Sequence, residues 1–256
     1  GALAGIDYDE EILRFMDHYL RGIDNGVDRA PRVRAFIMGE NLWRTATVLP
    51  FPGTHPLRLN FSAGPAGGRL SEATPLAGTR TFVSDPDRPF VDPFASRSGA
   101  HDYRALATRS DVAVFETAAL PSSLRVLGNI EVRLSISVDA PDADIWVRLF
   151  DVAPDGTAWN LMSPGLDVIR LSTRVDAPPL VPGQPTPVVL RDLLTGNQFK
   201  AGHRLRAVVM TSFMPYLARN LQTGQSEVNS ADRRVARVTV HTGPGHDSFL
   251  VLPVIP

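Results

Sequence analysis

The sequence predicts an all-β fold, a jelly-roll β-sandwich that is preceded by one N-terminal helix. The 256 residues include 22 Pro and 20 Gly, a proportion that favours many turns and short strands over long helices. After Pro31, apolar and polar residues alternate over about ten to twelve short segments, the pattern of half-buried strands. Before Pro31, a single segment has helical periodicity. Short strands separated by turn signals are typical of sandwiches and jelly rolls.

The helix is predicted over residues 7–21. Asp7 can cap its N-terminus, and acidic residues follow in the first turn, where the helix dipole favours negative charge. Gly22 can take the left-handed conformation that ends a helix. Its apolar face consists of Ile12, Phe15, Met16, Tyr19 and Leu20. An isolated helix of about 15 residues is marginal in water, so we expect this face to be covered, by the chain's own sandwich or by a second copy in a homodimer.

The clearest strand is Asn129 to Val138, where apolar and polar residues alternate strictly. We expect its apolar face in the core, with Ile130, Val132, Leu134, Ile136 and Val138 pointing inward. Residues 62–80 are rich in Gly, Ala and Pro and are predicted as a loop, and residues 85–99 as a long irregular segment. The other predicted strands are 33–38, 44–49, 57–61, 81–84, 111–117, 144–152, 157–162, 166–175, 186–194, 203–212, 234–241 and 247–252.

The composition argues against several classes of protein. The formal net charge is -1, from 26 basic and 27 acidic residues, which disfavours nucleic-acid binding and a polybasic membrane patch. The chain has no cysteine, so disulfides, thiolate zinc sites and a cysteine nucleophile are excluded. No stretch approaches the length of about 18 apolar residues that a membrane-spanning helix needs, and no signal peptide is evident. Nothing in the composition indicates a compartment.

No motif completes an active site. The nearest match to the G-x-S-x-G turn of serine hydrolases is Gly224 to Val228, which lacks the second glycine, so Ser226 is not predicted as a nucleophile. The glycine-rich run 64–68 lacks the Lys and the helix of a phosphate loop. The histidines show no metal-binding spacing and are interpreted as structural; they are His18, His55, His101, His203, His241 and His246. We predict no catalytic residue, cofactor or metal in this chain.

Two weaker patterns leave alternatives open. Three closely spaced aspartates are Asp139, Asp142 and Asp144. Their oxygens could hold calcium, but a polar turn whose side chains bond the backbone is the favoured interpretation. The three tryptophans are Trp43, Trp146 and Trp159. They could line a sugar-binding groove, although core or interface packing is more usual.

Several segments, taken in order, resemble one family. Residues 13–22 with Asn25-Gly26 are similar to the "RFFDHWLKG…NG" stretch of X-prolyl dipeptidyl-peptidases and cocaine-esterase-like acyl esterases, and residues 31–44 are similar to their "PPVRLFVMGENRWR". Shorter matches to "RPDVL", "DAPDTD", "DVxPDG", "AGHRLRV", "FARNLNTG" and "SxLxLPV" follow at residues 109–112, 139–144, 151–156, 201–206, 218–224 and 248–253. The order and number of the matches make the resemblance specific.

The resemblance implies a chain that lacks the catalytic centre of its family. In that family an α/β-hydrolase domain carries a Ser-Asp-His triad, and a C-terminal jelly-roll domain of the galactose-binding-domain-like kind follows it. The match begins at the last helix of the hydrolase domain, so no catalytic residue is carried over. The implied division is 1–30 as the terminal helix and turn of the hydrolase domain and 31–256 as the jelly-roll domain. We therefore expect a truncated or processed part of a serine hydrolase, inactive alone.

The implied partner is the N-terminal α/β-hydrolase domain. Loop 213–224 mixes apolar and polar side chains in the way that interfaces do, so we predict that it meets that domain and borders the substrate cleft. The candidate contact residues are Phe213, Tyr216, Arg219 and Asn220. A loop folded back onto its own sandwich is the alternative. Two other classes stay open: an autonomous carbohydrate-binding jelly roll, and a protein-interaction module that docks through helix 7–21.

Overall fold

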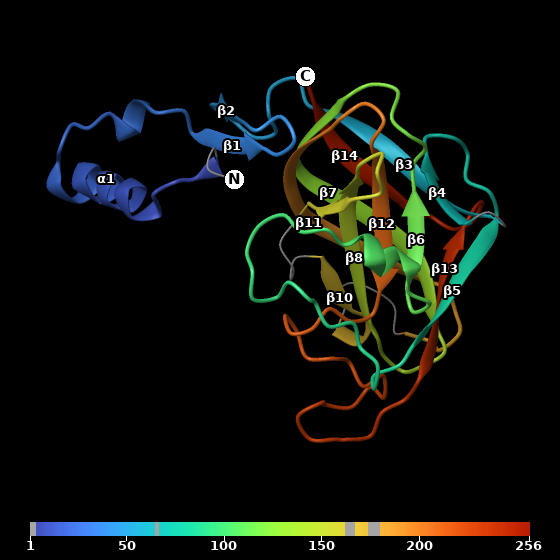
Figure 1. Cartoon of the computed structure of the whole chain (residues 1–256). Helices are drawn as coiled ribbons and strands as arrows, with labels where there is room; N and C mark the ends of the chain where they lie inside the picture. Colours follow the sequence, from blue (N-terminus) through green and yellow to red (C-terminus); the bar gives the residue numbers. More distant parts are fainter. Residues whose placement is uncertain (1–3, 65–66, 162–166, 174–179) are drawn as a thin grey trace.

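The computed structural model describes residues 4–64, 67–161, 167–173 and 180–256. In this part of the chain, one α-helix precedes a two-stranded sheet and a 12-stranded sheet (Figure 1). The larger sheet is mixed, because β4 (Gly67–Ser71) and β6 (Ala113–Glu116) pair in parallel while its other pairs are antiparallel. As described, it does not close into a barrel. The predicted fold class, mostly β with one N-terminal helix, is confirmed.

Helix α1 (Tyr8–Arg21) forms where the sequence predicts it. The Oδ1 atom of Asp7 accepts a hydrogen bond from the backbone N–H of Glu10 at 3.0 Å, and Gly22 ends the helix with a φ of 70°. Both ends therefore use the predicted capping residues. Within the described ranges, no helix is long and apolar enough to span a membrane.

The apolar face of α1 does not pack on the sandwich. Its five side chains stay exposed, from 48% at Met16 to 77% at Leu20, and Figure 1 shows the helix standing away from the large sheet. The expectation that the chain's own sandwich covers this face is therefore wrong. The contacts that hold α1 are polar. Arg14 Nη2 donates to the Asn25 carbonyl oxygen at 3.1 Å, and Arg34 in the segment that follows forms an ion pair with Glu11 at 2.7 Å.

The two-stranded sheet connects α1 to the sandwich. Strands β1 (Val33–Ile37) and β2 (Leu42–Ala46) pair as an antiparallel hairpin. Gly39 in its turn has a φ of 79°, and a Cβ there would lie 2.3 Å from the Gln198 carbonyl oxygen, so only glycine fits. Ile37 is the only buried side chain among the described residues 4–54. The hairpin thus attaches to the sandwich through a very small core.

The remaining strands form the larger sheet, and most lie close to a predicted segment. They are β3 (His55–Gly64), β4, β5 (Gly78–Ser84), β6, β7 (Leu124–Val138), β8 (Asp144–Val152), β9 (Ala158–Asn160), β10 (Val168–Arg170), β11 (Thr186–Phe199), β12 (Arg204–Met210), β13 (Ala236–Thr242) and β14 (Phe249–Ile255). Short 3-10 helices occupy Val27–Arg29, Arg104–Thr108 and Leu171–Thr173. The strand order is β10-β8-β12-β6-β4-β3-β14-β7-β13-β5, with β9 beside β8 and β11 beside β7. Strands β3 and β5 contact each other although three strands separate them in this order, so the sheet folds over into two layers.

Strand β7 carries the centre of the core. Its five predicted inward residues, Ile130, Val132, Leu134, Ile136 and Val138, are each at most 1% exposed, which confirms the prediction. The strand begins at Leu124 rather than at Asn129, because its partner β11 keeps pairing with it as far as Phe199 opposite Leu124.

Residues 62–80 do not form one continuous loop: the prediction is wrong for the residues that lie in β3, β4 and β5, whereas 72–77 are irregular and 65–66 lie outside the described residues. Strand β3 runs to Gly64, β4 starts at Gly67 and β5 starts at Gly78. The glycines that suggested a loop permit close backbone contact instead. A Cβ on Gly68 would lie 2.2 Å from the carbonyl oxygen of Val114, and a Cβ on Gly78 would lie 2.5 Å from that of Ala63. Only a residue without a side chain allows such approach inside a sheet.

Both faces of β8 are buried. Ile145, Val147 and Leu149 belong to the main core, while Trp146 and Phe150 belong to a second apolar cluster under the irregular segments of the chain. Arg148 lies between Trp146 and Phe150 in the sequence and pairs with Asp167 at 2.6 Å. Both charged side chains are buried, with 1% and 0% of their surface exposed. The irregular segments on this side therefore cover a packed interior.

Candidate functional site

Two irregular segments of the sandwich, residues 85–99 and 213–227, lie together and form a surface that we call the loop platform. The segments are joined through their backbones. The N–H of Met214 donates to the Phe90 carbonyl oxygen at 2.9 Å, and the N–H of Asp92 donates to the Met214 carbonyl oxygen at 2.8 Å. Arg219 Nη1 adds a bond to the Pro86 carbonyl oxygen at 2.7 Å. Two segments that lie far apart in the sequence thus form one surface.

The buried carboxylate of Asp92, within the first segment, joins the two segments of the platform. Asp92 accepts hydrogen bonds from the hydroxyl of Tyr103 at 3.0 Å, from the hydroxyl of Tyr216 at 2.9 Å and from the N–H of Phe94 at 3.0 Å. Burial and the negative charge of Asp92 raise the pKa of Tyr103, and burial together with the bond to Asp92 raises the pKa of Tyr216. Both tyrosines therefore stay protonated and donate to the carboxylate at neutral pH.

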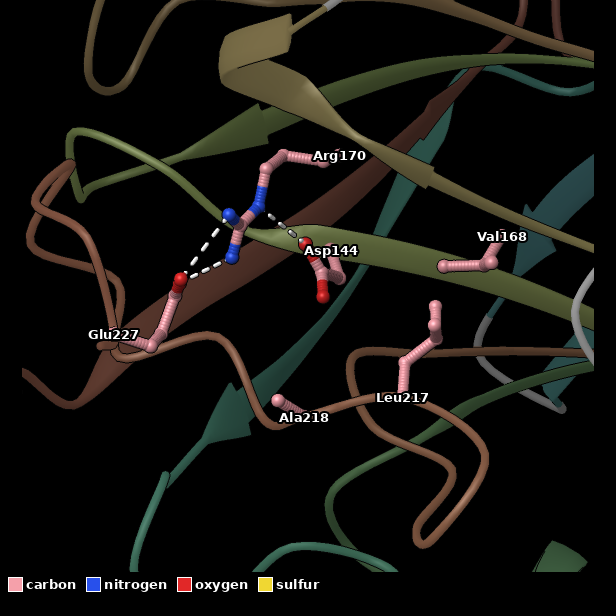
Figure 2. A pocket seen from close by; sticks show the side chains of 6 residues that line it. All are labelled: Asp144, Val168, Arg170, Leu217, Ala218 and Glu227. Atoms are coloured by element: carbon pink, nitrogen blue, oxygen red, sulfur yellow. Dashed lines mark hydrogen bonds and ion pairs between the residues drawn. The ribbon is translucent and has the colours of Figure 1, made fainter.

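A pocket of about 360 Å³ lies at the edge of the platform (Figure 2). Its lining residues are Asp144, Val168, Arg170, Leu217, Ala218 and Glu227. The guanidinium of Arg170 crosses it: Nε lies 3.2 Å from Asp144 Oδ1, and Nη1 donates to Glu227 Oε2 at 3.2 Å. Burial opposes the charge of Arg170, but its bonds to Glu227 and Asp144 raise its pKa. The pocket combines an ion-paired wall with an apolar wall formed by Val168 and Leu217.

The side-chain amide of Asn220 holds the residues beside this pocket in place. Asn220 Nδ2 donates to Asp142 Oδ2 at 2.9 Å and to Asp144 Oδ1 at 2.8 Å, and its Oδ1 accepts from the N–H of Gln222 at 2.7 Å. Burial raises the pKa of Asp144, while the bonds from Asn220 and Arg170 oppose that rise. Protein donors thus occupy the oxygens that the sequence offered as calcium ligands, and the described residues contain no group of three His, Asp or Glu side chains that could hold a metal ion.

The structure separates the four predicted contact residues into two pairs. Phe213 and Asn220 are buried, at 1% and 4% exposure, and support the loop from inside. Tyr216 is 37% exposed and Arg219 is partly exposed, so both reach the surface of the platform. Leu217, at 44% exposure, lies beside them and was not singled out from the sequence. That the platform meets a catalytic domain stays a prediction.

Several hydrogen-bonded pairs of polar side chains were not predicted from the sequence. Ser135 and Ser137 on β7 hydrogen-bond to His246 and His241 at 3.0 and 2.8 Å. His203 Nδ1 lies 2.7 Å from the buried Asp151. No spacing motif could reveal these pairs, because strand register brings the partners together from distant parts of the chain. The hydroxyl of Ser226, by contrast, accepts a bond from the N–H of Val228 at 3.3 Å and has no histidine partner among the described residues.

The fold and the loop platform define a sandwich-type β domain that presents a folded loop surface and one uncovered apolar helix. Residues 25–251 match the family described as the X-Pro dipeptidyl-peptidase C-terminal non-catalytic domain. The chain belongs to this family, as its resemblance to these hydrolases implied.

Individual relatives agree with this assignment. The cocaine esterase of Rhodococcus sp. (strain MB1 Bresler) is 34% identical over 267 residues, which cover 94% of this chain and 45% of the esterase. The crystal structure of an aminopeptidase from the marine sediment archaeon Thaumarchaeota archaeon has a TM-score of 0.81 at 27% identity, over 96% of this chain and 43% of its own. An α-amino acid ester hydrolase has a TM-score of 0.77 at 27% identity, over 95% of this chain and 44% of its own. The chain therefore spans less than half the length of these relatives.

Proposed function

We propose that this chain serves as the C-terminal β domain of a larger serine hydrolase, where it docks against the catalytic domain and helps to shape the substrate cleft. The larger protein would hydrolyse an ester or amide bond through an acyl-enzyme. The names of the relatives support this reaction class, because they include an esterase, an aminopeptidase and an amino acid ester hydrolase. The chain itself contributes binding surface and stability to the larger protein.

The observation that carries the proposal is the uncovered apolar surface of the N-terminal segment. Among the described residues, 22 large apolar side chains are exposed, and 12 of them lie between residues 8 and 49. On α1 they form one face. On the β1–β2 hairpin and the segment after it they are Leu42, Trp43, Val48 and Leu49. We call the exposed apolar side chains of residues 8–49 the apolar N-terminal surface.

A surface of this kind is costly to leave in water. Each Å² of apolar area removed from water contributes about 25 cal/mol, so a partner that covers the α1 face gains several kcal/mol from burial. Contiguous exposed apolar surface marks an interaction site in soluble proteins. A catalytic domain on the same polypeptide is the partner that fits best, since the relatives of this chain have more than half of their length outside the matched part. A homodimer through residues 7–21 is the alternative for the chain alone.

The loop platform supplies the second part of the proposal. Tyr216 and Arg219 would contact the catalytic domain, while Phe213 and Asn220 hold the loop in shape from below. Leu217 at the mouth of the pocket would then border the substrate cleft. The bonds to Asp92 and Pro86 keep this surface in place, and a fixed surface can select among substrates by shape.

The carbohydrate-binding alternative receives less support. Trp146 is buried in the second apolar cluster, so it cannot stack on a sugar. Trp43 lies on β2 of the small sheet and Trp159 lies on β9 of the large sheet, so the two exposed rings belong to different sheets. In addition, Trp43 packs edge-on against Phe36 at 5.5 Å and carries the Arg34 guanidinium at 5.3 Å, contacts that occupy its ring.

Activity measurements test the first part of the proposal. The purified chain should not hydrolyse p-nitrophenyl esters or X-Pro p-nitroanilides above the buffer rate, because no motif in it supplies an activated nucleophile. Ser226→Ala is the matched control. Turnover by the chain that disappears in this variant would show that the chain has a catalytic centre of its own.

Kinetics of the longer protein test the part about the cleft. Leu217→Ala should change KM by about two- to tenfold for at least one substrate, because a partly exposed side chain in an apolar contact contributes about 0.4–1.4 kcal/mol, near the lower end of what such a contact gives to discrimination. The control is Leu194→Ala, since Leu194 is similarly exposed but lies on β11, away from the platform. Equal kinetic constants for both variants and the parent protein would remove the cleft role and leave the docking role untouched.

A further inference from the structure

The turn between β13 and β14 holds two histidines that the proposed function does not use. His241 lies near the end of β13, and His246 follows the sequence Thr-Gly-Pro-Gly. The turn is closed by a hydrogen bond from the N–H of His246 to the Gly243 carbonyl oxygen at 3.0 Å. A Cβ on Gly243, which has a φ of 97°, would lie 2.4 Å from the Cα of Ala77, so this turn has very little freedom.

The backbone on both sides of the turn is fixed as well. The hydroxyl of Ser248 donates to the His241 carbonyl oxygen at 2.7 Å and accepts from the N–H of Ser135 at 2.9 Å. Ser248 therefore fastens the beginning of β14 to β13 and to β7. The two imidazoles project from a hairpin whose backbone is held at three points.

The rings are close together, and each is oriented by a serine. Their centroids are 5.0 Å apart with an interplanar angle of 32°. His241 Nε2 lies 2.8 Å from Ser137 Oγ, and His246 Nδ1 lies 3.0 Å from Ser135 Oγ. The other nitrogen of each ring, Nδ1 of His241 and Nε2 of His246, has no hydrogen-bond partner among the described residues.

The distance between the ring centroids matches that of two imidazoles bound to one ion. With metal–nitrogen bonds of about 2.0–2.1 Å and an N–metal–N angle of about 90–109°, two imidazoles that share an ion have ring centroids about 4.5–5.2 Å apart. The observed 5.0 Å falls in this range. Histidines that bind metals also donate their second ring N–H to an oxygen that fixes the ring, which is the role that the two serines can fill.

The surroundings leave room for further ligands. A pocket of about 390 Å³ adjoins His246 and is lined by Ser135, Thr186, Pro187 and Asp247 among others. Since the described residues contain no cluster of three His, Asp or Glu side chains suited to a metal, the remaining ligands of an ion here would be water. Two fixed imidazoles and several waters suit a divalent ion of the late transition series, for which nitrogen ligands are preferred over carboxylate oxygens.

We propose that His241 and His246 form a two-histidine site for a divalent late transition-metal ion, with Ser137 and Ser135 orienting the rings. The Irving–Williams order places Cu²⁺ first, ahead of Ni²⁺ and Zn²⁺. The site contains no residue of the apolar N-terminal surface or of the loop platform, so its observations are separate from those that support the docking proposed above. The simpler alternative is a histidine pair that only closes the hairpin through its serine bonds.

Titration of the purified full chain with Cu²⁺ and Ni²⁺ tests the site. We expect one ion per chain, a rise in Tm at saturating Ni²⁺ because the ion binds the folded form, and nitrogen hyperfine coupling from two imidazoles in the Cu²⁺ electron paramagnetic resonance spectrum. His246→Gln and His241→Gln should each weaken Ni²⁺ binding at least tenfold. Ser135→Ala should weaken it less, by up to about tenfold. His55→Ala and His18→Ala are the controls and should bind Ni²⁺ as the parent chain does.

The proposal fails if the double variant His241→Gln/His246→Gln binds Ni²⁺ as tightly as the parent chain, or if the parent chain shows no binding below millimolar concentration. Circular dichroism of each variant shows whether it is folded. Should a variant unfold, the resonance spectrum of the parent chain still decides, since coupling to fewer than two imidazole nitrogens contradicts the assignment.

Discussion

The sandwich and the N-terminal segment are two regions of one chain with opposite surfaces. In the sandwich, the inward side chains of β7 are at most 1% exposed, and even a charged pair is fully enclosed. In described residues 4–54, only Ile37 is buried, although this segment has a helix with a continuous apolar face. The sandwich buries most of its own apolar side chains, whereas the N-terminal segment leaves an apolar surface exposed.

Helix α1 has the local signals that define a helix but lacks the tertiary packing that stabilises the sandwich. Helix α1 has both caps, an acidic first turn and an i,i+4 ion pair between Asp17 and Arg21 at 2.7 Å. Such features stabilise a helix by tenths of a kcal/mol to about 1 kcal/mol each, which is marginal for 14 residues in water. We infer that α1 gains its full stability only when its apolar face is covered.

Breaking an ion pair in each region should give the largest difference. Asp167→Ala removes one partner of a buried ion pair, and we expect a loss of about 3–5 kcal/mol in the free energy of unfolding. Asp24→Ala removes a pair with Arg29 in which both side chains are mostly exposed, and we expect less than about 1 kcal/mol. Urea denaturation measures both. Similar losses in the two variants would mean that the regions do not differ as described.

Apolar truncation sharpens the same comparison. Ile136→Ala should cost about 2–5 kcal/mol in the isolated chain, because it leaves a cavity in the packed core. Phe15→Ala should change the free energy of unfolding of the isolated chain by less than about 0.5 kcal/mol, since the ring of Phe15 is already exposed there. In the longer protein, the cost of Phe15→Ala should rise above that value. An equal, small cost in both contexts would indicate that no partner covers α1.

The contrast between local and distant contacts also decides which elements can be predicted from the sequence. Strand β7 was predictable because its apolar and polar residues alternate strictly, and β8 was predictable because apolar residues predominate on both sides of Arg148. The helix was predictable because Asp7 and Gly22 are local signals. Strand β4 and the beginning of β5, residues 78–80, were missed because Gly68 and Gly78 lie close to backbone that is distant in the sequence. The sequence does not distinguish a glycine in a loop from a glycine in a crowded strand.

The site was predictable only in part, for a related reason. The mixed composition of loop 213–224 indicated a functional surface, but it could not tell which side chains point outward. Phe213 and Asn220 point inward because their partners lie inside. Phe213 packs against Trp146 on β8, and Asn220 donates hydrogen bonds to Asp142 and Asp144. Asp92, which fastens the platform through two tyrosines, lies in a segment with no recognisable motif.

Amide hydrogen exchange over residues 8–21 tests the central claim most directly. In the isolated chain, we predict rapid exchange of the α1 amides and strong protection of the β7 amides. Light scattering of the same sample shows whether a dimer forms. A variant without residues 1–22 is the control for dimerisation through the helix. In the longer protein, we predict that protection of the α1 amides rises at least a hundredfold, because the catalytic domain covers the apolar face. Equal exchange of α1 in the isolated chain and in the longer protein would contradict the account.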